Sequence, residues 1–262
     1  MLHLLKIEWL KIKNYSTFWV LGILYICSIT GINFIAHEIN KKAPKDPMSQ
    51  AVIGVPPFEF PQVWQTTTWL SSFLLFLPGL LIIISLTNEF TFKTHRQNII
   101  DGTSRTQFVL VKLVMVFITA IFSTLVVTIN AAAFGITEAG EAFSLKGSVY
   151  IGYFFIQAMN YALLAMVFSL LFKRSGIAIG VFFLYSTIIE NLIAGLLIKY
   201  AKGSGYFMPL ESSDNLIPFP FFQKVVEKFV ERPSVNYLLM ASILYLIAFV
   251  IVSKRKFETD DL

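Results

Sequence analysis

Long apolar runs separated by short polar connections dominate the chain. A helix needs about 20 mostly apolar residues to cross the roughly 30 Å hydrocarbon core of a bilayer. Six stretches meet that requirement, and their apolar residues are continuous rather than alternating, which favours helices over barrel strands. The pattern predicts an all-α integral membrane protein with six transmembrane spans: 18–36, 68–86, 110–133, 150–172, 176–198 and 237–253.

Composition supports the membrane assignment and excludes a soluble domain. The chain is 56% hydrophobic and 14% charged, with a mean hydropathy of +0.69. A soluble domain carries roughly 25% charged residues. The net charge of +5 and pI near 9.2 are explained by basic residues flanking the spans, and no cluster of basic and aromatic residues indicates nucleic acid.

Residue types that support catalysis or metal binding are sparse. Cys27 is the single cysteine, and the three histidines lack the spacing of metal ligands. The sequence also lacks a Gly-rich phosphate loop ending in Gly-Lys-Ser/Thr. We therefore expect no metal site, no catalytic residue and no cofactor on this chain. Lys6, Glu8, Lys11 and Lys13 interrupt the N-terminal apolar residues, so no cleaved signal peptide is expected.

Charge distribution predicts the orientation. Six spans place both termini on one side, together with twelve of the 21 Lys and Arg residues. Because basic residues in short loops favour the cytoplasmic side, we predict a multi-pass protein of the cell (inner) membrane with both termini cytoplasmic.

Three regions flank or interrupt the spans. Residues 1–16 place Leu2, Leu5, Trp9 and Ile12 at helical spacing among lysines, which indicates a helix in the membrane interface. A continuation of the first span is the alternative. The transmembrane domain is predicted over 17–254, with an outer loop at 199–234, and residues 255–262 form a cytoplasmic tail. The prolines of the outer loop suggest a segment that dips into the membrane or packs over its outer face.

The connection at 88–108 contains the most informative pattern. Glu89 fits the N-terminus of a short helix, Gly102 fits its left-handed end, and Ser104 and Gln107 have capping-box spacing. We predict a short, charged cytoplasmic coupling helix. Four apolar residues lie among the charges, which favours a docking surface over an ordinary solvated loop. They are Phe90, Phe92, Ile99 and Ile100.

This connection resembles the cytoplasmic coupling region of the type-2 ABC exporter permeases. In that family an acidic residue follows the second span, then Gly-Thr-x-Arg, then a small-residue turn with Ser-Arg. Glu89, Thr94-x-Arg96, Gly102 and Ser104-Arg105 match that pattern. Lys93 replaces the family's usual glycine, and Gly102-Thr103 replaces its usual Pro-containing turn. The likeness covers the whole chain, including the interfacial helix, the six spans and the long outer segment after span five.

The resemblance implies a permease subunit rather than an enzyme. Such a subunit pairs with a second copy or a homologue and with two ABC ATP-binding subunits, which hold the ATP and Mg. The implied ATPase-coupling residues are Glu89, Phe90, Phe92, Arg96, Ile99, Ile100, Gly102, Ser104 and Arg105. In this scheme the apolar members fill a groove on the ATPase, while Glu89, Arg96 and Arg105 set the register by charge.

Polar residues inside the spans are candidates for a substrate path. Glu190 is the single acidic residue well inside a span, and a carboxylate in hydrocarbon usually faces a partner, a cavity or water. Gln157 and Asn160 share one face of span four. A substrate path and structural pairing between helices are both open for these residues. Pro78 and Gly79 predict a kink in span two.

Two other classes of function remain as alternatives. A self-contained secondary transporter or channel needs several intramembrane ionisable residues or an inverted repeat, and a lone Glu190 argues against it. A membrane-embedded enzyme needs clustered acid, base or nucleophile residues within the spans, and no such cluster is apparent.

Overall fold

The computed structural model describes residues 2–42, 56–100, 102, 104–138, 142–221 and 232–259. Within these ranges the chain forms helices and their connections, without a strand. Five helical stretches are long and apolar enough to cross a membrane. They are α2 (Ser16–Lys42), α7 (Arg105–Thr137), α8 (Val149–Phe172), the stretch Ser175–Tyr200 and α13 (Val235–Thr259). The all-helical membrane prediction is confirmed at this level.

A sixth stretch qualifies only if a bent pair of helices counts as one span. These helices are α4 (Val63–Ser72) and α5 (Phe76–Thr91), which meet at 45°. The sequence predicted one span over 68–86 with a kink at Pro78 and Gly79, but the break lies a few residues earlier. The break is at 73–75 and α5 begins at Phe76, so Pro78 lies in the first turn of α5, where its missing N–H leaves no helical hydrogen bond unmade. Gly79 permits close packing, because a Cβ there would lie 2.5 Å from the Phe182 ring.

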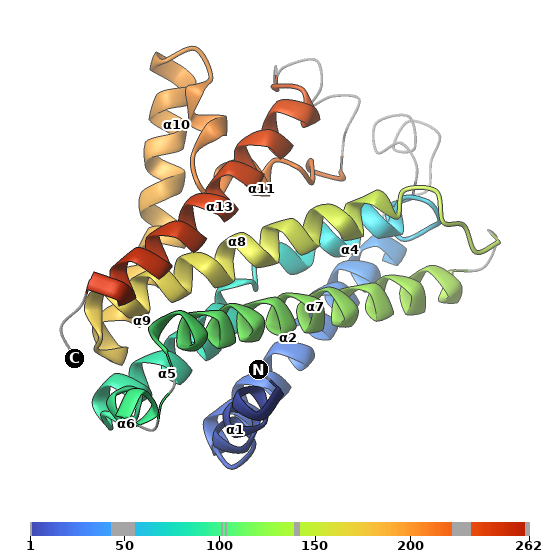
Figure 1. Ribbon diagram of the computed structural model, residues 1–262. Helices are drawn as coiled ribbons and strands as arrows, with labels where there is room; N and C mark the ends of the chain where they lie inside the picture. The colour runs from blue at the N-terminus through green and yellow to red at the C-terminus, as the bar shows by residue number, and fades with distance from the viewer. Residues whose placement is uncertain are drawn as a thin grey trace.

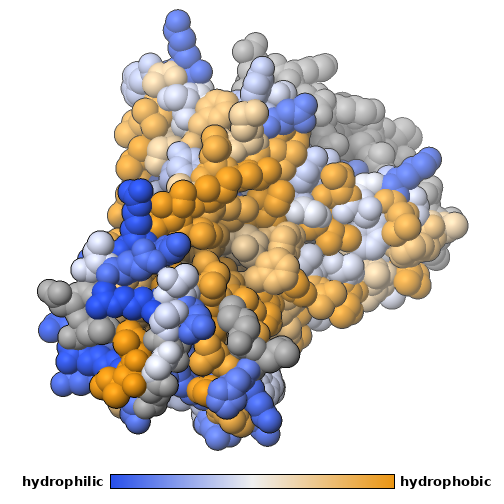
Figure 2. Space-filling view, viewed as in Figure 1, coloured by the Kyte–Doolittle hydropathy of each residue, from blue (hydrophilic) through white to orange (hydrophobic). Residues whose placement is uncertain are grey.

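Helix α8 lies at the centre of the bundle (Figure 1). It packs against α4, α5, α7 and α13, and most of its residues are buried. Helices α2 and α13 instead expose most of their apolar side chains. Figure 2 shows a continuous apolar surface over the middle of one face, with hydrophilic residues gathered at the end that carries α1 and α6. Such a surface suits contact with lipid.

The N-terminal helix α1 (Leu2–Lys13), the short helix α6 (Thr94–Ile100) and the end of α13 lie at the same end of the bundle. Helix α1 is separate from α2, so it does not continue the first long helix. At the other terminus, α13 runs to Thr259 and so includes the first residues of the predicted cytoplasmic tail at 255–262, which stays a prediction. Residues 260–262 lie outside the described ranges.

Within the predicted outer loop at 199–234, the described residues 204–217 fold back against the bundle. The stretch Ser175–Tyr200 consists of α9 (Ser175–Leu184), the π-helical turn η1 (Tyr185–Ile189) and α10 (Glu190–Tyr200). It is followed by the 3-10 turn η2 (Ser204–Phe207) and the short helix α11 (Glu211–Asp214). Asp214 contacts α8 at Gln157, about 12 Å along the axis from the start of α8. Of the two predicted alternatives, the structure therefore favours a segment that dips inward. Residues 222–231 lie outside the described ranges.

Candidate coupling site

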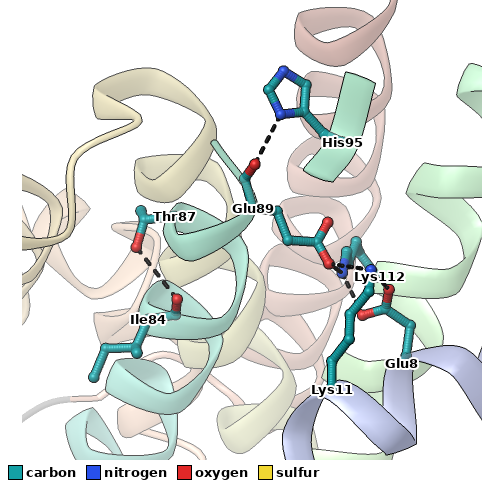
Figure 3. Close-up of polar contacts among 7 residues, drawn as sticks. All are labelled: Glu8, Lys11, Ile84, Thr87, Glu89, His95 and Lys112. Carbon is teal, nitrogen blue, oxygen red and sulfur yellow. Dashed lines mark hydrogen bonds and ion pairs between the residues drawn. The ribbon is translucent and has the colours of Figure 1, made fainter. Parts of the chain in front are cut away.

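A buried ion cluster joins α1, α5 and α7 at the end of the bundle that carries α6 (Figure 3). The Nζ of Lys112 lies 2.7 Å from Oε1 of Glu89 and also contacts Oε2 of Glu8. The Nζ of Lys11 lies 2.9 Å from Oε1 of both Glu8 and Glu89. Each lysine therefore bridges both carboxylates. We call these four residues the inner ion cluster.

Because this cluster is buried, its stability depends on the balance between its positive and negative charges. Glu8, Glu89 and Lys112 are each no more than 5% exposed, and a buried charge without a partner is costly. Burial raises the pKa of the Glu8 carboxyl, but Lys112 and Lys11 outweigh burial and hold that pKa below its ordinary value. Burial likewise lowers the pKa of Lys11, but Glu89 and Glu8 outweigh it and raise that pKa. The pKa shifts of the two α1 residues therefore favour their charged forms, with Glu8 as a carboxylate and Lys11 as an ammonium group.

The position of Glu89 corrects the sequence prediction. Glu89 was expected to begin the coupling helix and to face a partner protein. It lies instead in the last turn of α5, buried, with its side chain toward α1 and α7. Its backbone carbonyl accepts a hydrogen bond from Nδ1 of buried His95 at 2.9 Å. Glu89 thus holds three helices together rather than forming an outer contact.

The four apolar residues of the connection divide into two pairs. Phe90 and Ile99 pack against the main hydrophobic core, and the Phe90 ring lies 4.9 Å from the ring of His95. Phe92 and Ile100 point outward and are 71% and 84% exposed. The predicted docking surface is therefore narrower than the sequence suggested, with Phe92 and Ile100 as its apolar members.

The connection between α6 and α7 has the glycine conformation and the helix cap that the sequence predicted. Gly102 has φ +96°, as expected for a position that favours glycine. The side chain of Ser104 accepts from the backbone N–H of Gln107 while the side chain of Gln107 accepts from the backbone N–H of Ser104, so the capping box is confirmed. Asp101 and Thr103 lie outside the described ranges.

The two arginines of the connection have different surroundings. Arg96 is exposed on α6. Arg105 begins α7, and its Nη1 donates to the backbone carbonyl of Glu258 near the end of α13 at 2.5 Å. The adjacent rings of Phe108 and Phe257 are stacked with centroids 4.5 Å apart. Arg105 therefore fastens α13 to α7, which leaves Arg96 as the predicted register residue that faces outward.

The predicted substrate-path residues are all buried, and two of them bind the inward-folded segment. Nε2 of Gln157 donates to Asp214 at 2.8 Å, and Oε1 of Glu190 accepts from the backbone N–H groups of Leu210 and Glu211 at 2.5 and 3.1 Å. Asn160 donates to the carbonyl of Ile156 in its own helix at 3.2 Å. These contacts favour structural pairing, and the substrate path stays a prediction.

Several residues of these sites were not identified from the sequence. Glu8 was named only as a charge that interrupts the N-terminal apolar residues, and neither Lys112 nor Asp214 was assigned a role in a site. The available signal was an isolated charge within an apolar stretch, which usually has a buried partner. Among the described residues no group of three or more His, Cys, Asp or Glu is arranged to hold a metal.

Comparison with known families shows which family the chain belongs to. Residues 50–262 match the model of a family described as "Protein of unknown function (DUF2705)". The chain belongs to this family. The match begins after α2 and includes α4 to α13, and therefore Glu89 and Lys112 of the inner ion cluster but not Glu8 or Lys11. No curated protein gives a significant match to the chain.

Proposed function

We propose that this DUF2705 protein is the membrane-spanning permease subunit of an ATP-driven ABC exporter. In this proposal α6 docks on a separate ATP-binding subunit, which holds the ATP and Mg. The observation that carries the proposal is the pair Phe92 and Ile100, which lie strongly exposed on either side of Arg96 at the charged end of the bundle. Exposed apolar side chains among charges mark interaction sites.

The contacts behind α6 supply a route for mechanical coupling. Helix α6 connects directly to α5 and α7, and the inner ion cluster ties both helices to α1. Arg105 and Phe108, both on α7, contact the end of α13 and so connect it to the same group of helices. A displacement of α6 by the ATPase would therefore move four helices together rather than deform one loop.

The conformation of Lys93 supports the resemblance to type-2 ABC permeases. Lys93 occupies the position at which that family usually has glycine, and its φ is +55°. This region of backbone space favours glycine. The local backbone thus retains a conformation that explains the family's usual residue, although the side chain differs.

The proposal also includes the topology that coupling requires. The bent pair α4 and α5 counts as one span, which gives six spans, and α1 lies in the cytoplasmic interface beside α6. Both termini are then cytoplasmic in a multi-pass protein of the cell membrane. Two such permeases, identical or homologous, pair with two ATP-binding subunits.

The test is co-purification with an ATP-binding subunit encoded in a neighbouring reading frame. The double variant Phe92→Ser/Ile100→Ser should weaken the complex at least about tenfold, because interface hot spots contribute roughly 2 kcal/mol or more. The matched control is Ile136→Ser/Leu145→Ser, which removes two similarly exposed apolar residues far from α6. The control should bind the ATPase as the unmodified protein does.

Two outcomes would contradict the proposal. Unchanged ATPase binding by the Phe92 and Ile100 variant would exclude α6 as the docking element. Transport by the purified chain in vesicles without any ATP-binding subunit would instead favour the alternative, a self-contained secondary transporter or channel.

A further inference from the structure

A cavity of about 470 Å³ lies between the α4–α5 break, α8, η1 and α11. Tyr161 lines it and lies halfway along α8, so the cavity is level with the middle of that helix. Ligand sites in proteins have volumes of roughly 300 to 1,000 Å³. The volume therefore suits a small organic molecule. We call this feature the central cavity.

Two interruptions of helical structure border the central cavity. The break between α4 and α5 contributes Ser72, Phe73 and Phe76, and the π-helical turn η1 contributes Ser186 and Thr187. Irregular backbone within a membrane domain is tolerated where it is buried in protein or lines a water-filled cavity. Turns of π-helix are also frequent at functional sites. Both interruptions meet at one space, which is the arrangement expected of a ligand site.

The exposed side chains beside η1 show what the cavity opens toward. Thr187 and Asn191 line the cavity and are exposed, although they lie in the stretch Ser175–Tyr200, which is apolar enough to cross a membrane. Polar side chains within such a stretch usually face a water-filled cavity or another protein rather than lipid. The central cavity is therefore suited to a polar ligand.

Two carboxyl groups give the central cavity an acidic character. Glu211 and Asp214 line it, and Arg232 is the single basic residue among the described residues that do so. Asp214 accepts hydrogen bonds from Gln157 and Tyr161, but a carboxylate offers about four lone-pair sites, so it can accept more. A positively charged ligand would stabilise the ionised form of both carboxyl groups. The lining therefore favours a cation.

An aromatic wall indicates which kind of cation the cavity suits. Trp69, Phe73 and Phe219 all line the cavity, and the Trp69 ring lies 4.8 Å from the Phe73 ring and 5.0 Å from the Phe219 ring. Aromatic faces attract cations, and clustered rings are the usual recognition element for quaternary ammonium groups. A metal ion would need several His, Cys, Asp or Glu ligands, and the described part of the chain holds no suitable group of three.

We propose that the central cavity binds a small organic cation, whose ammonium group contacts the aromatic wall and the carboxyl groups of Glu211 and Asp214. As the class of molecule that an exporter would carry, this cation rests on the proposed function. Binding itself requires only this chain.

The test is binding of choline to the purified chain in a non-ionic maltoside detergent, measured by calorimetric titration without any ATP-binding subunit. The comparison ligand is 3,3-dimethyl-1-butanol, which has the shape of choline but carries no charge. We expect saturable choline binding at least about tenfold tighter than that of the neutral alcohol, because the rings and carboxyl groups act on the charge.

Two substitutions test the two parts of the site. Glu211→Gln should weaken choline binding roughly tenfold, and Trp69→Leu roughly fivefold, while binding of the neutral alcohol changes less. Asp214 is left unchanged because its contacts hold α11 against α8. The matched controls are Glu38→Gln and Trp19→Leu, which alter the same residue types on α2, outside the cavity. Both controls should bind choline as the unmodified protein does.

A thermal unfolding midpoint for each variant separates loss of the site from loss of the fold. Glu211→Gln retains the backbone N–H that donates to Glu190, so its midpoint should stay near that of the unmodified protein. If Trp69→Leu unfolds early, Glu211→Gln still decides the outcome.

Several results would overturn the proposal. Absence of saturable choline binding, or equal affinity for choline and the neutral alcohol, would show that the cavity does not recognise an organic cation. Equal weakening by Glu211→Gln and Glu38→Gln would show general attraction to acidic surface. Displacement of choline by an equal concentration of sodium chloride would assign the cavity to an inorganic cation.

The same measurements keep this proposal separate from the proposed function. Choline binding by a chain that captures no ATP-binding subunit would support the site and contradict the exporter. Capture of that subunit by a chain that binds no choline would contradict the site alone.

Discussion

Buried carboxylates occur in two regions of the molecule and have different partners there: the inner ion cluster, and the contacts that hold the folded-back segment around α11 against α8 and α10. Glu8 and Glu89 are buried among α1, α5 and α7, and both are paired with lysines. Glu190 is equally buried, but the partners of its Oε1 are neutral backbone N–H groups. Asp214 likewise accepts hydrogen bonds from Gln157 and from the hydroxyl of Tyr161.

The difference concerns what each site requires from a carboxylate. In the inner ion cluster the negative charge balances lysines, so an uncharged substitute leaves an ammonium group without its counter-charge. At Glu190 the contacts require an acceptor oxygen, which an amide also provides. Changes in charge should therefore reduce stability strongly in the inner ion cluster and weakly at Glu190.

The largest expected loss of stability follows from a substitution of Lys112. Lys112→Met leaves Glu8 and Glu89 with Lys11 as their one remaining partner in the cluster, and should reduce the free energy of unfolding by about 3 kcal/mol or more. Denaturant unfolding in mixed micelles would measure the loss. Adding Glu89→Gln to Lys112→Met restores the charge balance, so the double variant should recover part of it. A double variant whose loss equals the sum of both single losses would contradict charge balance as the cause.

An intermediate effect is expected at Glu190, where two substitutions separate charge from hydrogen bonding. Glu190→Ala leaves two buried backbone N–H groups without an acceptor and should cost roughly 2 kcal/mol. Glu190→Gln retains an acceptor and should cost less than about 1 kcal/mol. The same unfolding measurement applies. A Gln variant as unstable as the Ala variant would mean that charge is needed here too, and the proposed contrast between the regions would fail.

The smallest effect is the pH dependence of the inner ion cluster. The pKa of Glu8 is lowered, so its contribution is complete above the unfolded value near 4.5 and is lost as pH falls through the folded pKa. The pKa of Lys11 is raised, so its contribution is complete below the unfolded value near 10.5 and is lost as pH rises through the folded pKa. The stability difference between the unmodified protein and Glu8→Gln should therefore be flat from about pH 6 to 9 and shrink at more acidic pH. A difference that varies across neutral pH would contradict this assignment.

The sequence predicted those parts of the fold that depend on residues close together in the chain, and it missed those that depend on packing between distant residues. The long helices were recognised because about 20 apolar residues in a row need lipid or a buried environment wherever they fold. The capping box at Ser104 and the left-handed Gly102 were also predicted, since a few neighbouring residues decide both. The break between α4 and α5 was displaced from Pro78, because the exact position of a bend depends on packing such as that of Gly79 against Phe182.

The candidate site was predicted in part. The sequence located the connection and its outward apolar residues Phe92 and Ile100, but it treated Glu89 as an outer contact. Glu89 is 81 residues from Glu8 and 23 from Lys112, and no local pattern shows that these side chains meet. The same reason explains Asp214, whose partners Gln157 and Tyr161 lie more than 50 residues away.

By itself, the sequence determined that this is a helical membrane protein with a charged, partly apolar connection after its second apolar run. Those properties depend on hydropathy and on residues within one helical turn of each other. Only the tertiary structure decided which charges are partners, because burial converts an isolated Glu or Lys into a group that must find its counterpart in another helix. Glu89 therefore has its role through Glu8, Lys11 and Lys112 rather than through its neighbours in the chain.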